Sequence, residues 1–404
     1  MSQKAVWVIA GGKMQQPLVK SLKQLNYWVI VSDQDPSCAC SQLADEFYAI
    51  DIFDVITHVG RSREVSEDRL ARSLGPIVAC VSVATDAHIT SAAVGKELGL
   101  QCASVDLCVL LRDKFATRLR LVSGGLLQPN SYIAGTFQEA ADLAGEMAFP
   151  FLLKAQDSSG SRGLATINRR NELTQNTFNQ TAQFSSSGNV LLEQILTPRE
   201  DIIAEQSVET IWFKGEMYWL NWVDRIFSRD ISRFEQLRKF YGSGLKIADG
   251  VEVGHLNPAV HSEAIVSDSK RVVKEAGLAL GLDTEEHPVI FKADLMQTFD
   301  GPVVLECTTR LSGGWDSSGS SILRGAQFQI GVTLIQSEVS FDNSVLNDYF
   351  SFGSSNRRSV CVLSDVDETF VDCIGREFAI AVGVDRRSSI SNCIEKLKDR
   401  AYVV

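Results

Sequence analysis

The sequence predicts a mixed α/β and α+β protein, in which a small parallel-sheet domain precedes a larger region of hairpins and helices. Residues 1–105 alternate short apolar runs with helical segments, which is the pattern of β-α-β units. Beyond them, strand-forming runs joined by tight turns predict antiparallel pairs. A chain of 404 residues is expected to form two or three domains.

Composition excludes several classes of protein. The apolar fraction of 45% and the charged fraction of 22% are those of an ordinary globular protein. A net charge of −11 argues against broad binding to nucleic acids or anionic membranes. No apolar run approaches the roughly 18 residues of a membrane span, and the short N-terminal run does not form a signal peptide. We expect a cytoplasmic protein without nucleic-acid or membrane partners, for which a homodimer remains open.

The nine cysteines are odd in number and scattered along the chain. Cys38 and Cys40 form a C-x-C pair, but no second pair or nearby histidine completes a zinc site. We therefore expect reduced, mostly buried thiols. Cys307 is expected to face the core, because strand neighbours alternate between the two faces of a sheet.

Residues 1–105 are predicted to form one domain with a parallel sheet. The predicted strands cover residues 5–10, 28–33, 47–50 and 77–82, and the predicted helices cover residues 15–25 and 87–99. The first β-α-β unit has Gly11 and Gly12 at its turn and Asp33 at its end. Dinucleotide-binding proteins share these features, but the incomplete G-x-G-x-x-G pattern argues against a nicotinamide oxidoreductase.

The remaining elements follow from the same kind of pattern. Predicted strands cover residues 149–155, 190–196, 205–213 and 217–227 and begin again at 358, while predicted helices cover residues 110–121, 261–280, 322–338 and 390–400. Trp219 and Trp222 are expected in the core. Residues 229–256 contain few apolar runs and are predicted to be loop with some helix, facing the substrate.

A loop rich in glycine and serine follows the strand that carries Lys154. Residues 158–163 are small apart from one arginine and include Gly160 and Gly163. Such a loop can fold its N–H groups over phosphates, with Lys154 as the charge partner. The alternative is an ordinary hairpin loop.

Residues 291–314 contain the most informative pattern of the chain. Two predicted strands meet at a tight turn, Asp300-Gly301, with Asp294 on the first strand and Glu306 on the second. An antiparallel pair brings these carboxylates together, and adjacent carboxylates repel unless a cation lies between them. With Arg310 and two glycines following, the hairpin predicts a site for a Mg²⁺-nucleotide. The alternative is a surface hairpin with two unrelated acids.

Taken together, these stretches resemble the ATP-grasp superfamily, in the branch of carbamoyl-phosphate synthase, biotin carboxylase and amino-acid ligases. The specific feature is the order of the parts: an α/β domain, an Asp-Lys-Phe-x-x-Arg helix, a Pro-x-x-x-Lys strand with its glycine-rich loop, an acid-bearing strand and a hairpin with Glu-x-x-x-Arg. The resemblance implies a pre-ATP-grasp domain over residues 1–105, a small lobe over 106–195 and a large lobe over 196–404.

The resemblance also implies roles for single residues. Lys114 and Lys154 correspond to the two ATP lysines, and Arg310 and Lys154 to the catalytic cations. The implied nucleotide-binding residues are Lys114, Lys154, Gly160, Gly163, Glu193, Gln194, Ile195 and Glu205, of which Glu193 to Ile195 would meet adenine and Glu205 the ribose. The implied metal ligands are Asp294, Glu306 and Thr308. Thr308 departs from the family, which usually has Asn at that position.

The implied function is an ATP- and Mg²⁺-dependent carboxylate–amine ligase that forms an acyl phosphate, with Mn²⁺ able to replace Mg²⁺. Its partners would be a small carboxylate and an amine. Arg225, Arg229 and residues 312–318 are the candidates for the acceptor side, although the two arginines would serve equally well in a surface ion-pair network. The alternatives are a carboxylase or formyl-phosphate-type transferase of the same superfamily, and a nucleotide sensor without catalytic activity.

Overall fold

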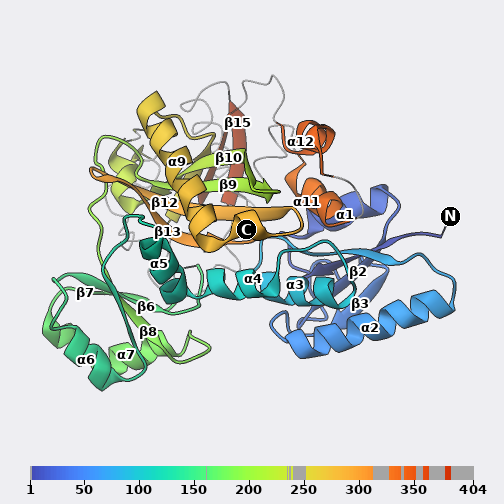
Figure 1. Ribbon diagram of the computed structural model, residues 1–404, viewed down its shortest axis with the longest axis horizontal. Helices are drawn as coiled ribbons and strands as arrows, with labels where there is room; N and C mark the ends of the chain where they lie inside the picture. The colour runs from blue at the N-terminus through green and yellow to red at the C-terminus, as the bar shows by residue number, and fades with distance from the viewer. Residues whose placement is uncertain are drawn as a thin grey trace.

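The described strands of the computed structural model form three sheets (Figure 1). The structure describes residues 2–160, 162–233, 235, 238–239, 252–312, 327–337, 341–351, 358–363 and 378–383. One sheet is parallel and two are antiparallel, which confirms the predicted mixture of α/β and α+β structure. Within the described residues, no helix is both long and apolar enough to cross a bilayer.

The N-terminal sheet has four parallel strands in the order β3-β2-β1-β4. Its strands are β1 (Ala5–Ile9), β2 (Trp28–Asp33), β3 (Glu46–Ala49) and β4 (Ile77–Ser82), and its helices are α1 (Gln16–Gln24), α2 (Val55–Ala71) and α3 (His88–Glu97). β1 and β4 are buried throughout, as continuous apolar strands between helices should be.

The glycine turn after β1 is covered by the chain's own loop. The N–H of Gly11 donates to Asp33 Oδ2 over 2.8 Å. A Cβ on Gly11 would stand 2.5 Å from Cys38 Sγ, so that loop fills the space beside the turn. Asp33 is therefore engaged by Gly11, which further weakens the case for a dinucleotide at this turn.

The segment after the first sheet contains two helices and not the single helix predicted over residues 110–121. α4 (Val105–Arg112) ends at Asp113, and α5 (Lys114–Ser123) starts there. Asp113 has an extended backbone, and its carboxylate accepts hydrogen bonds from the N–H groups of Phe115 and Ala116. An aspartate is a good N-cap, and here capping a new helix prevails over continuing the old one.

The small antiparallel sheet has the strand order β5-β8-β6-β7. Its strands are β5 (Ser131–Ala134), β6 (Phe151–Ala155), β7 (Leu164–Ile167) and β8 (Val190–Gln194), accompanied by α6 (Phe137–Leu143), η1 (Arg170–Glu172) and α7 (Gln175–Ala182). Phe151 and Leu153 on β6 are fully buried and pack with Phe178 of α7. Lys154 points to the other face of β6, where the sheet meets the rest of the molecule.

The large sheet has seven strands in the order β13-β12-β9-β10-β11-β14-β15. They are β9 (Glu205–Phe213), β10 (Glu216–Phe227), β11 (Glu252–Asn257), β12 (Val289–Thr298), β13 (Gly301–Thr308), β14 (Arg358–Leu363) and β15 (Phe378–Gly383); the remaining elements are η2 (Ser228–Arg233), α9 (Glu263–Leu280), η3 (Leu282–Thr284), α11 (Phe328–Gln336) and α12 (Asn343–Tyr349). α4, α5 and α9 bury their apolar residues against one face of this sheet (Figure 1).

One prediction after residue 228 needs correction, and others fall outside the described residues. Residues 229–256 include β11, which the sequence did not predict because the strand carries few apolar residues. Helix α11 begins at Phe328 and ends at Gln336, within the predicted span of 322–338, of which residues 322–326 and 338 lie outside the described residues. Residues 240–251, 313–326 and the predicted helix at 390–400 lie outside the described residues. Trp222 is buried in the core and Trp219 packs against it, as predicted.

Gly277 on α9 is required by close packing. A Cβ at this position would lie 2.1 Å from the ring of Trp212, which is fully buried under the helix. We expect Gly277→Ala to lower the urea midpoint by the equivalent of about 1–3 kcal/mol, the usual range for overpacking. Gly60 on α2 has nothing within 4 Å of its ideal Cβ. As the control, Gly60→Ala should raise stability by about 0.5–1 kcal/mol, because alanine favours a helix over glycine; a destabilisation no larger in Gly277→Ala than in Gly60→Ala would contradict this packing.

Candidate functional site

The β12–β13 hairpin places the two predicted metal carboxylates opposite each other. Asp294 pairs with Glu306, and Lys292 pairs with Thr308. A bulge produces this register: Leu295 pairs with Val304, so Leu305 is an extra residue on β13. Without the bulge, Asp294 would face Leu305, and Glu306 would be out of register with it. The predicted pairing of Asp294 with Glu306 is therefore present, but it depends on the bulge at Leu305, which the turn sequence alone does not specify.

Strand alternation separates this polar patch from the core. Glu306 and Thr308 lie on one face of β13, and Cys307 lies on the other, where it is buried with the residues under α9. Burial holds the pKa of the Cys307 thiol well above its ordinary value, so the thiol stays protonated. The prediction that Cys307 is a core residue is confirmed.

Two cations contact Asp294, and neither contact was predicted from the sequence. Its Oδ2 lies 2.5 Å from Lys292 Nζ and 3.2 Å from Arg225 Nη1. Burial alone would raise the pKa of Asp294, but the charges of Lys292 and Arg225 outweigh it, and the pKa lies below the ordinary value. Lys292 could have been found from its position two residues before Asp294, on the same face of the strand.

The hairpin also presents oxygen atoms without partners. Oδ1 of Asp294 and Oγ1 of Thr308 are buried and have no hydrogen-bond partner within the described part of the chain. Mg²⁺ prefers oxygen ligands and is commonly held by one or two carboxylates together with substrate phosphates. No group of three or more His, Cys, Asp or Glu side chains that could hold a metal occurs among the described residues. Two carboxylates and a hydroxyl fit a Mg²⁺ ion whose remaining ligands would be phosphates and water.

A buried ion-pair triad joins the small lobe to this hairpin. Glu193 on β8, only 2% exposed, lies 2.5 Å from Lys154 Nζ and 2.9 Å from Arg118 Nε. Burial would raise the pKa of Glu193, but Lys154 and Arg118 hold it well below the ordinary range. Both carboxylate oxygens of Glu193 are therefore bound by cations, and the role of Glu193 in this site is to position Lys154.

Arg118 extends the triad to the bulge of the hairpin. Its Nη1 donates to the carbonyl oxygen of Val304 over 2.7 Å, and its Nη2 donates to that of Leu305 over 2.6 Å. One guanidinium thus connects α5, β8 and β13. The predicted helix motif contained Arg118, but nothing in the local sequence indicated that it would contact the hairpin.

The predicted phosphate loop lies between Lys114 and the small sheet. Lys114, the first residue of α5, donates a hydrogen bond from Nζ to the carbonyl oxygen of Ser158. Gly160 and Gly163 both have positive φ, at 63° and 68°. A Cβ on Gly163 would also lie about 3.0 Å from Phe184 and from the carbonyl oxygen of Thr181, so glycine is needed there on both grounds.

Asp86 of the N-terminal domain ties this loop to Arg310. Its carboxylate lies 2.6 Å from Arg310 Nη2 and 3.3 Å from Arg162 Nη2, and it accepts a hydrogen bond from Ser159 Oγ. Burial raises the pKa of Asp86, but the charge and hydrogen bond of Arg310 together with the Ser159 hydroxyl outweigh it, so the pKa lies well below the ordinary value. Asp86 and Arg310 are 224 positions apart, so the sequence carried no signal for this contact.

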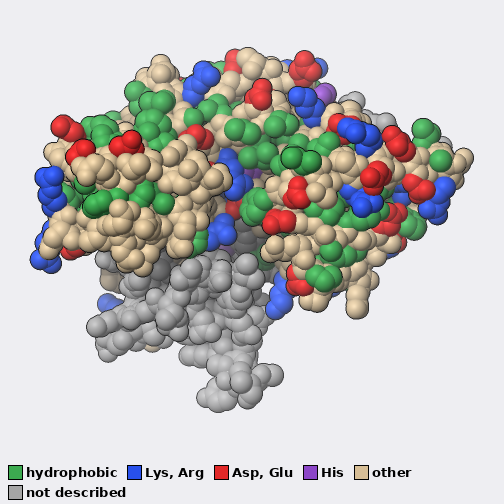
Figure 2. All heavy atoms as spheres, turned by 90° about the horizontal axis from the view of Figure 1, so that it is seen from below, with side chains coloured by type: hydrophobic (Ala, Val, Ile, Leu, Met, Phe, Trp, Pro, Cys, Tyr) green, Lys and Arg blue, Asp and Glu red, His purple; other side chains and the backbone are tan. Residues whose placement is uncertain are grey.

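The other predicted nucleotide-binding residues have partners of their own or face solvent. The N–H of Gln194 donates to the carbonyl oxygen of Asn130 over 2.9 Å, and Ile195 is exposed. Glu205 lies 2.5 Å from Arg229 Nη2. Arg225 and Arg229 thus form ion pairs with carboxylates of the predicted site, in addition to the Arg225–Glu252 pair at 2.7 Å. Figure 2 shows Lys and Arg side chains around the hollow between the two halves of this face.

Removing the charge of Glu193 should destabilise the fold, because Arg118 and Lys154 lose their shared anion. We expect Glu193→Gln to lower the free energy of unfolding at neutral pH by about 3–5 kcal/mol, as for other broken buried pairs. A carboxyl with a lowered pKa contributes stability that is present above its unfolded pKa, about 4.3, and is lost as the pH falls. The variant should therefore lose less stability than the wild type between about pH 5 and pH 3.

Urea unfolding across this pH range checks the expectation. Glu146→Gln, a change of an exposed acid in the same lobe, serves as the matched control. If Glu193→Gln were as stable as Glu146→Gln and had the pH dependence of the wild type, the ion pairs of Glu193 would not stabilise the fold.

Comparison with known proteins supports the fold described above. No protein-family model and no curated protein matches the chain. An L-amino acid ligase from Bacillus licheniformis matches with a TM-score of 0.71 and 15% identity, over 99% of this chain and 98% of that one. A carboxyaminoimidazole ribonucleotide synthase from Aspergillus clavatus, complexed with ATP, matches with a TM-score of 0.68 and 14% identity, over 98% of each chain. A phosphoribosylglycinamide synthetase from Anaerococcus prevotii matches with a TM-score of 0.65 and 14% identity, over 100% and 97%. These proteins are ATP-grasp enzymes, and this chain has the ATP-grasp fold.

Proposed function

We propose that the protein is an ATP- and Mg²⁺-dependent ligase that joins a small carboxylate to an amine through an acyl phosphate. The observation that carries the proposal is the register of the hairpin, which sets Asp294 opposite Glu306 beside the unpartnered hydroxyl of Thr308. The fold supports it, because an L-amino acid ligase has the same architecture over nearly the whole chain. ATP and Mg²⁺ are part of the proposal, as is the assignment of the predicted site residues.

In the first step, the substrate carboxylate attacks the γ-phosphorus of ATP, and ADP leaves. Bound Mg²⁺ would supply charge neutralisation across the phosphates, and Asp294, Glu306 and Thr308 are the residues that would hold it. Lys154, fixed by Glu193, and Lys114, at the carbonyl oxygen of Ser158, give the phosphate loop two positive charges. Because both cations are held in place before substrate arrives, they stabilise charge without reorganisation.

In the second step, an amine attacks the acyl carbon, and phosphate leaves. Arg310 is placed to hold the acyl phosphate, because Asp86 fixes its guanidinium between the phosphate loop and the N-terminal domain. Arg225 and Arg229 are less available to the acceptor than predicted, because both are paired with carboxylates of the site. Arg310 is itself paired with Asp86, so its position beside the phosphate loop, and not freedom from ion pairs, is our reason for assigning it the acyl phosphate.

A nucleotide sensor is the second candidate. Thr308 replaces the usual Asn, and Lys292 and Arg225 already neutralise part of the charge on Asp294. ATP binding without turnover would favour this candidate. A carboxylase of the same fold would instead turn over ATP with bicarbonate.

ADP release distinguishes these functions. Purified protein should release ADP from Mg²⁺-ATP with at least one member of an amino-acid panel, and mass spectrometry should detect the amide product. Bicarbonate is included in the panel to detect a carboxylase. ATP binding with no ADP release from any mixture would refute the ligase.

Two substitutions test the site itself. Glu306→Gln and Lys154→Ala should each lower ADP release by about 100-fold or more, because each removes a charge fixed at the transferring phosphate. The exposed residues Glu263 and Lys274 offer matched controls, Glu263→Gln and Lys274→Ala, which should keep wild-type rates. Wild-type turnover in both site variants would refute the assignment of the site.

A further inference from the structure

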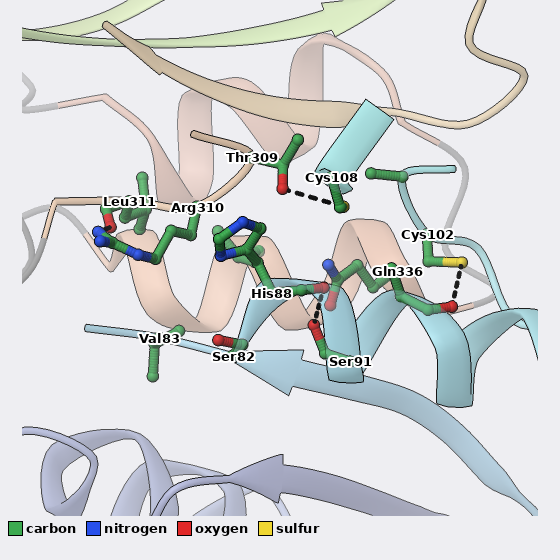
Figure 3. Close-up of a pocket in the computed structure, with 13 residues that line it drawn as sticks. Ser82, Val83, His88, Ser91, Cys102, Cys108, Thr309, Arg310, Leu311 and Gln336 are labelled. Carbon is green, nitrogen blue, oxygen red and sulfur yellow. Dashed lines mark hydrogen bonds between the residues drawn. The ribbon is translucent and has the colours of Figure 1, made fainter. Parts of the chain in front are cut away.

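A small polar cavity separates the N-terminal domain from the large lobe beside Arg310. His88 and Ser91 of α3, Cys108 of α4, Gln336 of α11 and Arg310 line it. Figure 3 shows the His88 ring between Arg310 on one side and Cys108 and Gln336 on the other. The cavity has room for about one molecule of the size of water.

Four buried polar atoms around this cavity lack a hydrogen-bond partner within the described residues. They are Nδ1 and Nε2 of His88, whose ring also lies near a backbone group of Cys108, together with Nε of Arg310 and Oε1 of Gln336. His88 is only 6% exposed. Buried polar groups are nearly always hydrogen-bonded, so unpartnered atoms on three residues that line one cavity indicate a bound molecule that forms hydrogen bonds there.

The cavity is close to electrically neutral. Burial and the nearby Arg310 lower the pKa of His88 to about 4, so its ring is uncharged at neutral pH, with one donor and one acceptor nitrogen. Burial raises the pKa of Cys102 to about 11 and that of Cys108 to about 12, so both thiols stay protonated. The charge of Arg310 is paired with Asp86. Among the described lining residues there is no carboxylate to meet an ammonium group, and the guanidinium of Arg310 is directed to Asp86.

We propose that this cavity is the subsite for the reactive nitrogen of the acceptor, taken as uncharged ammonia or the –NH₂ end of a small primary amine. The N–H groups of the amine donate to Oε1 of Gln336 and to the acceptor nitrogen of the neutral His88 ring, which leaves its lone pair free to attack the acyl carbon. This inference rests on the proposed ligase, since it places the amine beside the arginine assigned to the acyl phosphate. An uncharged amine is also the form that can act as a nucleophile.

Histidine ring ¹⁵N spectroscopy tests the subsite without any turnover. The chain has five histidines, so the His88 signals can be assigned by their loss in His88→Gln. Hydroxylamine, which is small and uncharged at neutral pH, is the probe. We expect a saturable shift of the His88 ring nitrogens in the wild type, and a dissociation constant about five to ten times weaker in Gln336→Leu, which lacks one acceptor.

Two further probes and one variant serve as controls. Methylammonium, which is charged at neutral pH, and sodium formate should leave the His88 signals unchanged. Gln329→Leu alters another buried amide of α11 outside the cavity lining and should bind hydroxylamine like the wild type. No shift with hydroxylamine, or a shift with formate in its place, would overturn the subsite even if Gln336→Leu failed to fold.

The outcomes for function and subsite are separable. A normal His88 response in a protein that never releases ADP would refute the ligase and keep the cavity as an amine site. ADP release with a silent His88 would refute the subsite alone.

Discussion

The guanidinium of Arg118, on α5, binds both β8 and the bulge of β13, and the arrangement of the site depends on these contacts. It shares the buried carboxylate of Glu193 with Lys154 and donates to the carbonyl oxygens of Val304 and Leu305. Those carbonyls belong to the bulge that shifts the register of β13. The same side chain thus orients the phosphate-side lysine and holds the backbone that sets Glu306 opposite Asp294. Arginine suits this role because its planar fork offers several donors and remains charged when buried.

The two faces of the large sheet differ in role: one packs against helices in the core, and the other carries the polar residues of the proposed site. α4, α5 and α9 cover the face that carries Val304 and Cys307, whereas Glu306 and Thr308 lie on the opposite face of β13. Substitutions on this polar face can therefore alter charge without opening the core. The N-terminal domain also contributes to the site, because Asp86 and His88 lie near Arg310 although they are distant from it in sequence.

Much of the fold followed from local patterns in the sequence. Continuous apolar runs predicted β1, β2 and β4 closely, and the Asp300-Gly301 turn predicted the β12–β13 hairpin. The break at Asp113 was missed because a helix period does not reveal an internal cap. Arg118, Lys292, Asp86 and His88 were missed as members of the site, because three of the four act through partners far away in the chain. Spacing predicts which residues share a strand face, but it does not predict which distant side chain will neutralise them.

Calorimetric titration with a non-hydrolysable ATP analogue, with Mg²⁺ or with EDTA, tests most directly whether the hairpin holds the metal of a nucleotide. We expect Mg²⁺ to strengthen analogue binding to the wild type markedly. In Glu306→Gln, we expect Mg²⁺ to change the affinity hardly at all, while the affinity in EDTA equals that of the wild type. Equal dependence on Mg²⁺ in the two proteins would show that the hairpin does not hold the metal.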